Sequence, residues 1–178
     1  MNTELMFSSK SGEWVTPKKF FKRFDDIYHF TTDAGASKTN ALCKDYLGLD
    51  NGRDALTSPW GAVTWCNPPY GRGIGRWVSK GWAESNVWTH NSDSLEHKIV
   101  VMLLPGRVDT KWFHDYVWDK ASQVIVVIGR IKFDIGRHFH KKTQTWCTEL
   151  HPAPFPSIVV VYDYRTRHHG MIWSRIDV

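Results

Sequence analysis

Long uninterrupted runs of apolar residues constrain the fold of this chain more than any other feature. The run from Lys98 to Leu104 is apolar after its first residue and ends at Pro105-Gly106. A second run covers 124–128, and a further strand is predicted at 157–163. A strand with one face in water alternates apolar and polar residues, whereas a continuous apolar run is typical of a strand that a parallel sheet buries on both faces. The sequence therefore predicts an α/β fold, with helices covering both faces of the sheet.

Segments with helical spacing alternate with these apolar runs. The predicted helices cover 18–24, 39–46, the region from Trp77 to Trp82, and 110–118. The remaining strands are predicted at 27–32, at 61–66 and, as an antiparallel hairpin partner of 157–163, at 171–176. Thr16 is expected to cap the first helix, with Pro17 as its first residue. The polar stretch 85–97 is interpreted as a surface loop.

Length and composition set the broad class of the protein. The 178 residues suffice for one domain, so 14–178 is interpreted as a single domain that follows a flexible arm at 1–13. With 42% hydrophobic and 23% charged residues the composition is that of a soluble globular protein, which excludes collagen-like and disordered classes. No stretch reaches the roughly 20 apolar residues that span a bilayer, and residues 1–12 lack the apolar core of a secretory signal. The three cysteines show no C-x-x-C spacing, which indicates a reducing compartment.

Charge and aromatic content favour a polyanionic partner. The chain has 23 basic and 18 acidic residues, a net charge of +5 and ten tryptophans. Basic side chains together with aromatic rings are expected of a protein that holds phosphates and stacks on bases. A zinc site is not predicted, because the spacing of the candidate ligands His138, His140, Cys147 and His151 matches no established zinc motif.

The strongest chemical signal is Asn67-Pro68-Pro69-Tyr70, directly after the strand at 61–66. Two prolines cannot continue a central strand, so they place a rigid loop at its carboxyl end, where open α/β sheets bind ligands. The Asn67 side-chain oxygen and the Pro68 carbonyl can converge there on one amino group, while Tyr70 offers a flat face to a planar substrate. An exocyclic amine on a heteroaromatic ring is a poor nucleophile, and two acceptors on its N–H bonds localise its lone pair for attack. A purely structural turn would explain the prolines but not Asn67 and Tyr70.

This motif and its surroundings resemble the phage-type, Dam-like DNA N6-adenine methyltransferases. The resemblance rests on Trp14-x-Thr16-Pro17, Phe30-Thr-Thr-Asp33-Ala-x-Ala36 with Asn40, Asp54-Ala55-Leu56 with Trp60, Trp65-Cys-Asn-Pro-Pro-Tyr-Gly71 with Trp77, and Gly129-Arg-Ile-Lys-Phe133. It implies a three-layer Rossmann-like methyltransferase fold, with a mainly parallel sheet and an antiparallel C-terminal hairpin. It also implies S-adenosyl-L-methionine (SAM) as the methyl donor and double-stranded DNA as the partner. The expected location is the cytoplasm of a bacterial host, with a phage or prophage gene as the source.

The resemblance assigns roles to individual positions. Its catalytic motif, which holds the target adenine, corresponds to Asn67, Pro68, Pro69 and Tyr70. The residues that it implies for SAM binding are Thr16, Pro17, Asp33, Ala34, Gly35, Ala36, Asp54 and Ala55. In similar enzymes the Thr16 position closes over the methionine end, the loop from Asp33 faces the methionine and ribose, and the Asp54 position accepts from the adenine amino group.

The segment between Asp33 and Asn67 is short for two complete βα units. The resemblance therefore implies a second βα unit that is reduced or missing. Asp45 and Asp50 are alternative candidates for the acid that binds the SAM ribose, and the sequence does not decide between them.

Methylating a paired adenine requires flipping the base out of the duplex. Basic residues near the motif and after later strands are expected to hold the DNA phosphates: Arg72, Arg76, Arg107, Arg130, Lys132 and Arg137. The Pro- and His-containing region 134–156 is predicted to be a loop that recognises the target. Two alternative functions stay open, namely a methyltransferase with the same motif that acts on RNA or on a protein glutamine, and a nucleic-acid-binding module without catalysis.

Overall fold

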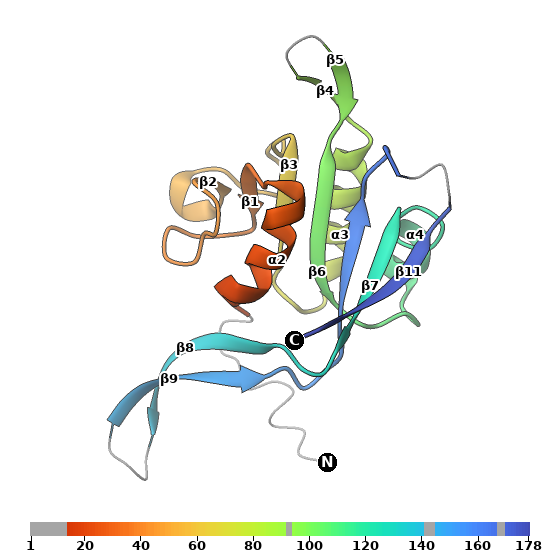
Figure 1. Cartoon of the computed structure of the whole chain (residues 1–178). Coiled ribbons are helices and arrows are strands. Elements are labelled where there is room, and N and C mark those ends of the chain that lie inside the picture. Colours follow the sequence, from red (N-terminus) through yellow and green to blue (C-terminus); the bar gives the residue numbers. More distant parts are fainter. Residues whose placement is uncertain (1–13, 92–93, 141–144, 167–169) are drawn as a thin grey trace.

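A seven-stranded sheet forms the centre of the protein in a computed structural model that describes residues 14–91, 94–140, 145–166 and 170–178 (Figure 1). The arm predicted at 1–13 lies outside the described residues, as do the side chains of 88–96 and 135–149. In spatial order the strands are β11 (Ile172–Asp177), β7 (Gln123–Ile128), β10 (Ser157–Tyr162), β6 (Ile99–Pro105), β3 (Val63–Cys66), β1 (Thr32–Ala34) and β2 (Asp45–Leu47). All neighbours in this sheet are parallel except the two that flank β10. The predicted mainly parallel α/β sheet is confirmed.

The continuous apolar run of β6 is buried on both faces of the sheet. Every residue of β6 is buried. Because successive side chains of a strand point to opposite faces, alternate residues of this strand enter two separate core clusters. Val100, Met102 and Leu104 belong to one cluster, and Ile99, Val101 and Leu103 belong to the other.

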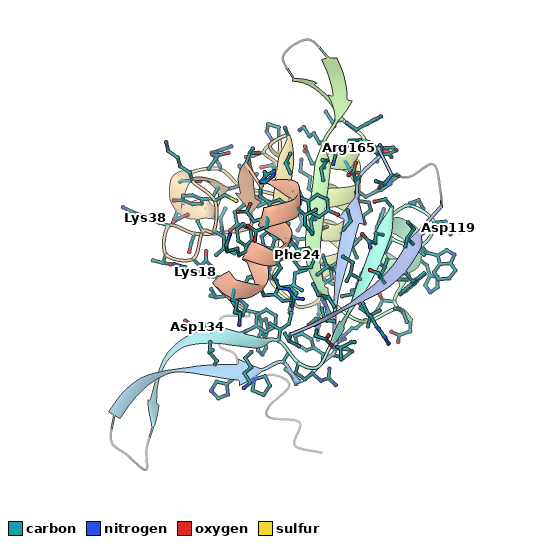
Figure 2. All side chains as sticks on the ribbon, in the orientation of Figure 1. Lys18, Phe24, Lys38, Asp119, Asp134 and Arg165 are labelled. Carbon is teal, nitrogen blue, oxygen red and sulfur yellow. The ribbon has the colours of Figure 1, made fainter. Side chains whose placement is uncertain are left out.

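Helices cover both faces of the sheet, which gives the expected three layers (Figure 1). Helix α2 (Lys18–Tyr28) lies on one face, and helices α3 (Ile74–Ser85) and α4 (Lys111–Tyr116) lie on the other. The buried Trp65 of β3 anchors α2, because its ring centroid lies 5.5 Å from that of Phe21 and 5.8 Å from that of Phe24. Phe24 is labelled on α2 in Figure 2. No helix among the described residues is long and apolar enough to cross a membrane.

The second βα unit is reduced, as expected. Turns without an α-helix connect β1 to β2, and only a short 3-10 helix, η1 (Leu49–Asn51), follows β2. The helix predicted at 39–46 is therefore wrong. The Asn40 side-chain oxygen accepts from the Ser37 N–H (2.6 Å), and such local bonds compete with helix formation. β2 is an edge strand whose first residue is exposed, so no apolar pattern marks it.

The first helix begins one residue later than predicted, at Lys18, and extends beyond the predicted end at Phe24. α2 extends to Tyr28 and closes at His29, whose φ of 56° lies in the left-handed region, so the strand predicted at 27–32 is wrong. Tyr28 follows Phe24 by one helical turn and stacks on Phe30, with ring centroids 5.9 Å apart. The N-cap is Pro17 rather than Thr16, and no side chain caps this helix. The Thr16 hydroxyl bonds elsewhere, as described below.

Two predicted loops form hairpins in the structure, and the last strand pairs differently from the prediction. The predicted loop 85–97 contains the end of α3 and an antiparallel hairpin of β4 (Trp88–Asn91) and β5 (Ser94–His97). The predicted loop 134–156 contains most of a second hairpin, β8 (Lys132–His140) with β9 (Thr145–Pro152), which projects from the opposite end of the molecule (Figure 1). β11 pairs in parallel with β7, so it is not the hairpin partner of β10.

Candidate active site

A cavity of about 470 Å³ opens where β1, β2 and β3 reach their carboxyl ends. This is the position at which open α/β sheets bind ligands. Its walls come from the loops that follow these three strands, from Asp54 to Leu56, and from an N-terminal segment, Trp14 to Thr16. The structure thus brings together segments that are far apart in the sequence.

Most of the residues expected to bind SAM line this cavity. They are Thr16, Asp33, Gly35, Ala36, Asp54 and Ala55. Pro17 and Ala34 do not line it: Pro17 is the N-cap of α2, and the Ala34 side chain is fully buried in the core. Sequence reasoning missed Gly48, which lines the cavity directly after β2. The signal would have been a glycine at the end of a strand, but that strand was predicted as a helix.

Close backbone contact between the loops after β1 and β2 shapes one wall. The N–H groups of Gly35 and Ala36 donate to the Leu47 carbonyl at 3.0 and 3.1 Å. Gly35 has a φ of 84°, which other residues rarely adopt, and a Cβ atom at Gly48 would lie 2.1 Å from the Ala36 carbonyl oxygen. Glycine is therefore required at both positions for the two loops to meet.

Gly48→Ala is expected to destabilise the fold by about 1–3 kcal/mol, because the new methyl group must displace backbone rather than a flexible side chain. SAM affinity is expected to fall with it, since the wall of the cavity moves. Gly73→Ala is the matched control, because its Cβ would meet nothing within 4 Å. Urea unfolding and calorimetric titration with SAM measure the two effects. Equal, small losses in both variants would show that the loop contact is not tight.

Asp33 places a buried carboxyl group at the end of β1 and on the cavity wall. The residue is 5% exposed, and one side-chain oxygen accepts from the Leu42 N–H at 2.9 Å. Burial raises the pKa of Asp33 to about 7, and the Leu42 bond offsets only part of this shift. A cationic ligand in the cavity would favour the charged form of this carboxyl group.

The structure separates the other acidic candidates. Asp50 lines the cavity after β2, and its carboxylate accepts from the Lys38 N–H at 2.7 Å. Asp45 lies outside the cavity wall and bonds instead to Thr32 and Arg53. Asp54 both caps a turn, by accepting from the Leu56 N–H at 2.9 Å, and lines the cavity.

The Asn67 side chain is fixed so that its oxygen is free. Its amide nitrogen donates to the Trp14 carbonyl at 2.5 Å and to the Thr16 hydroxyl oxygen at 2.9 Å. Its Oδ1 atom is buried and has no hydrogen-bond partner among the described residues. A buried acceptor without a partner is rare in proteins, and here it belongs to a residue of the cavity wall. Pro68 and Pro69 extend the same wall.

Tyr70 lies beside the cavity and is held from two directions. Its hydroxyl donates to the Leu103 carbonyl at 3.3 Å, and its ring meets those of Phe155 and Phe133 edge-to-face, with centroids 5.4 and 6.3 Å away. Burial holds the pKa of Tyr70 well above its ordinary value, so the hydroxyl stays protonated near neutral pH. The residue can therefore serve as a fixed aromatic surface, not as an acid or base.

The basic residues singled out in the sequence follow the carboxyl ends of several strands. Arg72 and Arg76 come after β3, Arg107 after β6, and Arg130 and Lys132 after β7, and all five are exposed. Arg137 belongs to β8, and its side chain lies outside the described part. The carboxyl ends of strands that run in the same direction lie at one edge of the sheet. These cations therefore lie at the same edge of the sheet as the cavity.

Comparisons with known proteins identify the family of this chain. The family model described as DNA N-6-adenine-methyltransferase (Dam) matches residues 5–165. A DNA N-6-adenine-methyltransferase of Haemophilus phage HP1 is 29% identical over 123 residues, which cover 67% of this chain. The match spans 65% of the length of that relative. The chain belongs to the DNA N-6-adenine-methyltransferase (Dam) family.

Proposed function

We propose that this protein transfers a methyl group from SAM to the N6 atom of adenine in double-stranded DNA. The observation that carries the proposal is the buried, unpartnered Oδ1 atom of Asn67 on the wall of a ligand-sized cavity. An acceptor that is fixed in orientation and has no partner among the described residues is suited to receive an N–H group from a substrate. Family membership supports adenine as that substrate.

The cavity fits SAM in size and in chemistry. Its volume of about 470 Å³ lies within the range of small-molecule sites. Two buried polar atoms on its wall, Asn67 Oδ1 and Trp65 Nε1, have no partner among the described residues. Asp33 offers a carboxyl group to the positive charges of SAM, Asp50 to its ribose, and Asp54 to its adenine. When bound, SAM supplies an electrophilic methyl group, whose bond to sulfur breaks as the bond to the adenine nitrogen forms, so that S-adenosylhomocysteine is left and the methylated amine releases one proton to solvent.

The residues of this chain act on the target amine by orientation rather than by strong base catalysis. Asn67 Oδ1 and the Pro68 carbonyl accept the two N–H bonds of the adenine amine, which concentrates the lone pair on nitrogen for in-line attack. Tyr70 stacks on the base. Its hydrogen bond to the Leu103 carbonyl and its edge-to-face contact with Phe155 hold the ring in place. Stacking of about 1–3 kcal/mol offsets part of the cost of flipping the base.

DNA contacts are assigned to the cationic side of the sheet. The exposed residues Arg72, Arg76, Arg107, Arg130 and Lys132 lie on the side where the cavity opens, and we propose that they bind phosphates. The β8–β9 hairpin, with Arg137 on β8, projects beyond this side and is proposed to contact the DNA around the target (Figure 1). An antiparallel ribbon of this kind can enter a DNA groove.

Labelling with tritiated SAM tests the proposal. The protein is incubated in parallel with unmethylated duplex DNA, with RNA and with a protein release factor, and the label is expected in DNA alone, as N6-methyladenine after digestion. DNA whose adenines already carry the methyl group is the matched control and should remain unlabelled. Label in RNA or protein only would overturn the choice of substrate. A protein that binds SAM and labels none of the three would be a binding module instead.

A further inference from the structure

We propose that Thr16 is a positioning residue that, with the Trp14 carbonyl, locks the Asn67 amide in the one orientation that presents its oxygen. This role differs from the SAM contact expected for Thr16, and it rests on the function proposed above. It also predicts that asparagine functions better than aspartate at position 67. The inference rests on the two hydrogen bonds that the Asn67 amide nitrogen donates, to the Trp14 carbonyl and to the Thr16 hydroxyl.

The Trp14 carbonyl dictates which way the amide faces. A backbone carbonyl only accepts hydrogen bonds, so the group 2.5 Å from it must be the NH₂ end of Asn67. That NH₂ group has two hydrogens, and the Thr16 hydroxyl oxygen at 2.9 Å accepts the second. With both donors used, the amide plane is fixed and Oδ1 is the polar atom left for a substrate.

The two acceptors are themselves held in place. Thr16 is 5% exposed, and the Val15 N–H donates to the Asp134 carbonyl at 3.3 Å. The Trp14 ring lies edge-to-face against Phe133 and Phe155, with centroids 5.5 Å away in each case. Asp134 lies where β8 leaves the body of the protein (Figure 2). The segment that orients Asn67 is therefore hydrogen-bonded to the first residues of the β8–β9 hairpin, through Val15 and Asp134. We propose that this hairpin contacts DNA.

Aspartate at position 67 would conflict with this arrangement. A carboxylate oxygen in place of the NH₂ group would face the Trp14 carbonyl oxygen, acceptor against acceptor, in a buried setting. Only the protonated form of the carboxyl group could donate to that carbonyl. Asn67→Asp is thus expected to be impaired at pH 8 and to gain activity as the pH falls, whereas the wild type has no such dependence from this residue.

The decisive comparison is Thr16→Val, which keeps the shape but removes the hydroxyl, against Thr16→Ser, which keeps the hydroxyl. Thr16→Val is expected to lower kcat about 10- to 100-fold, since a misdirected acceptor costs rate rather than binding. Calorimetric affinity for S-adenosylhomocysteine and the KM for SAM should both stay within about threefold. Thr16→Ser should recover most of the rate. Loss of S-adenosylhomocysteine binding with kcat preserved would make Thr16 a cofactor contact and overturn the proposal.

A readout without turnover separates this proposal from the proposed function. If Thr16 and Asn67 share a hydrogen bond, the change in Tm caused by Thr16→Val should be smaller in an Asn67→Ala background than in the wild type. Equal changes in both backgrounds would show that the bond contributes nothing. This measurement holds whichever nucleic acid or protein the wild type labels, because it reports the contact itself.

Discussion

Replacing Asn67 by alanine is expected to lower kcat for methyl transfer to DNA by about 100- to 1,000-fold, the typical cost of removing one preorganised polar group from a transition state. The variant loses the buried acceptor that we assign to the target amine, and the Pro68 carbonyl alone then orients it. SAM affinity should change little, because the side chain bonds to Trp14 and Thr16 rather than to the loops after β1 and β2. Single-turnover labelling separates chemistry from binding.

Asn86→Ala is the matched control for this experiment. Asn86 is an exposed asparagine at the far end of α3, where its side chain bonds to the Trp82 carbonyl. Its removal should leave both kcat and SAM affinity at the wild-type level. If Asn67→Ala instead kept its kcat and lost SAM affinity, Asn67 would belong to the cofactor site and the assignment of Oδ1 to adenine would be wrong.

The large features of the fold were predictable because burial leaves a mark in sequence. The strands β6 and β10 are buried throughout and carry apolar runs, and the paired prolines after β3 place a loop at the correct edge of the sheet. β7 carries an apolar run as well, although its Val126 and Ile128 are exposed. The thin elements left no such mark. β2 is a three-residue edge strand, and the β4–β5 and β8–β9 hairpins stand outside the main sheet, so neither apolar alternation nor helical spacing identified them.

The sequence identified most of the residues that line the cavity, but it did not predict the contacts that these residues make with one another. Thr16 was expected to cap a helix and contact SAM, yet its hydroxyl accepts from Asn67, 51 positions away in the chain. The requirement for glycine at position 48 arises from the Ala36 carbonyl across the loop. Both facts depend on contacts between segments that are distant in sequence, which local propensity and periodicity cannot report.

Asp33→Asn is expected to make the protein more stable at pH 8 while weakening SAM binding. Burial raises the pKa of Asp33 from 3.8 to about 7. Between these values the folded state holds a proton that the unfolded state has released, so stability is lost as pH rises from about 4 to about 7 and stays low above that. This loss is at most about 4 kcal/mol, and an uncharged asparagine, which can still accept from the Leu42 N–H, avoids most of it.

The same substitution removes the Asp33 carboxylate, whose negative charge we propose faces the positive charges of SAM. Binding of a cationic ligand favours the ionised carboxyl group, so wild-type affinity should increase from pH 6 to pH 7.5, while the affinity of Asp33→Asn should be about 10- to 100-fold lower at pH 7.5 and should lack this increase. Asp45→Asn is the matched control, since that carboxylate is exposed and lies outside the cavity wall. Urea unfolding at pH 5 and pH 8, with calorimetric SAM titration, measures both effects. A stabilised variant that still bound SAM normally would show that Asp33 is buried but does not contact the cofactor. A variant destabilised at pH 8 would show that the buried carboxylate is stabilised by more than its hydrogen bond to the Leu42 N–H.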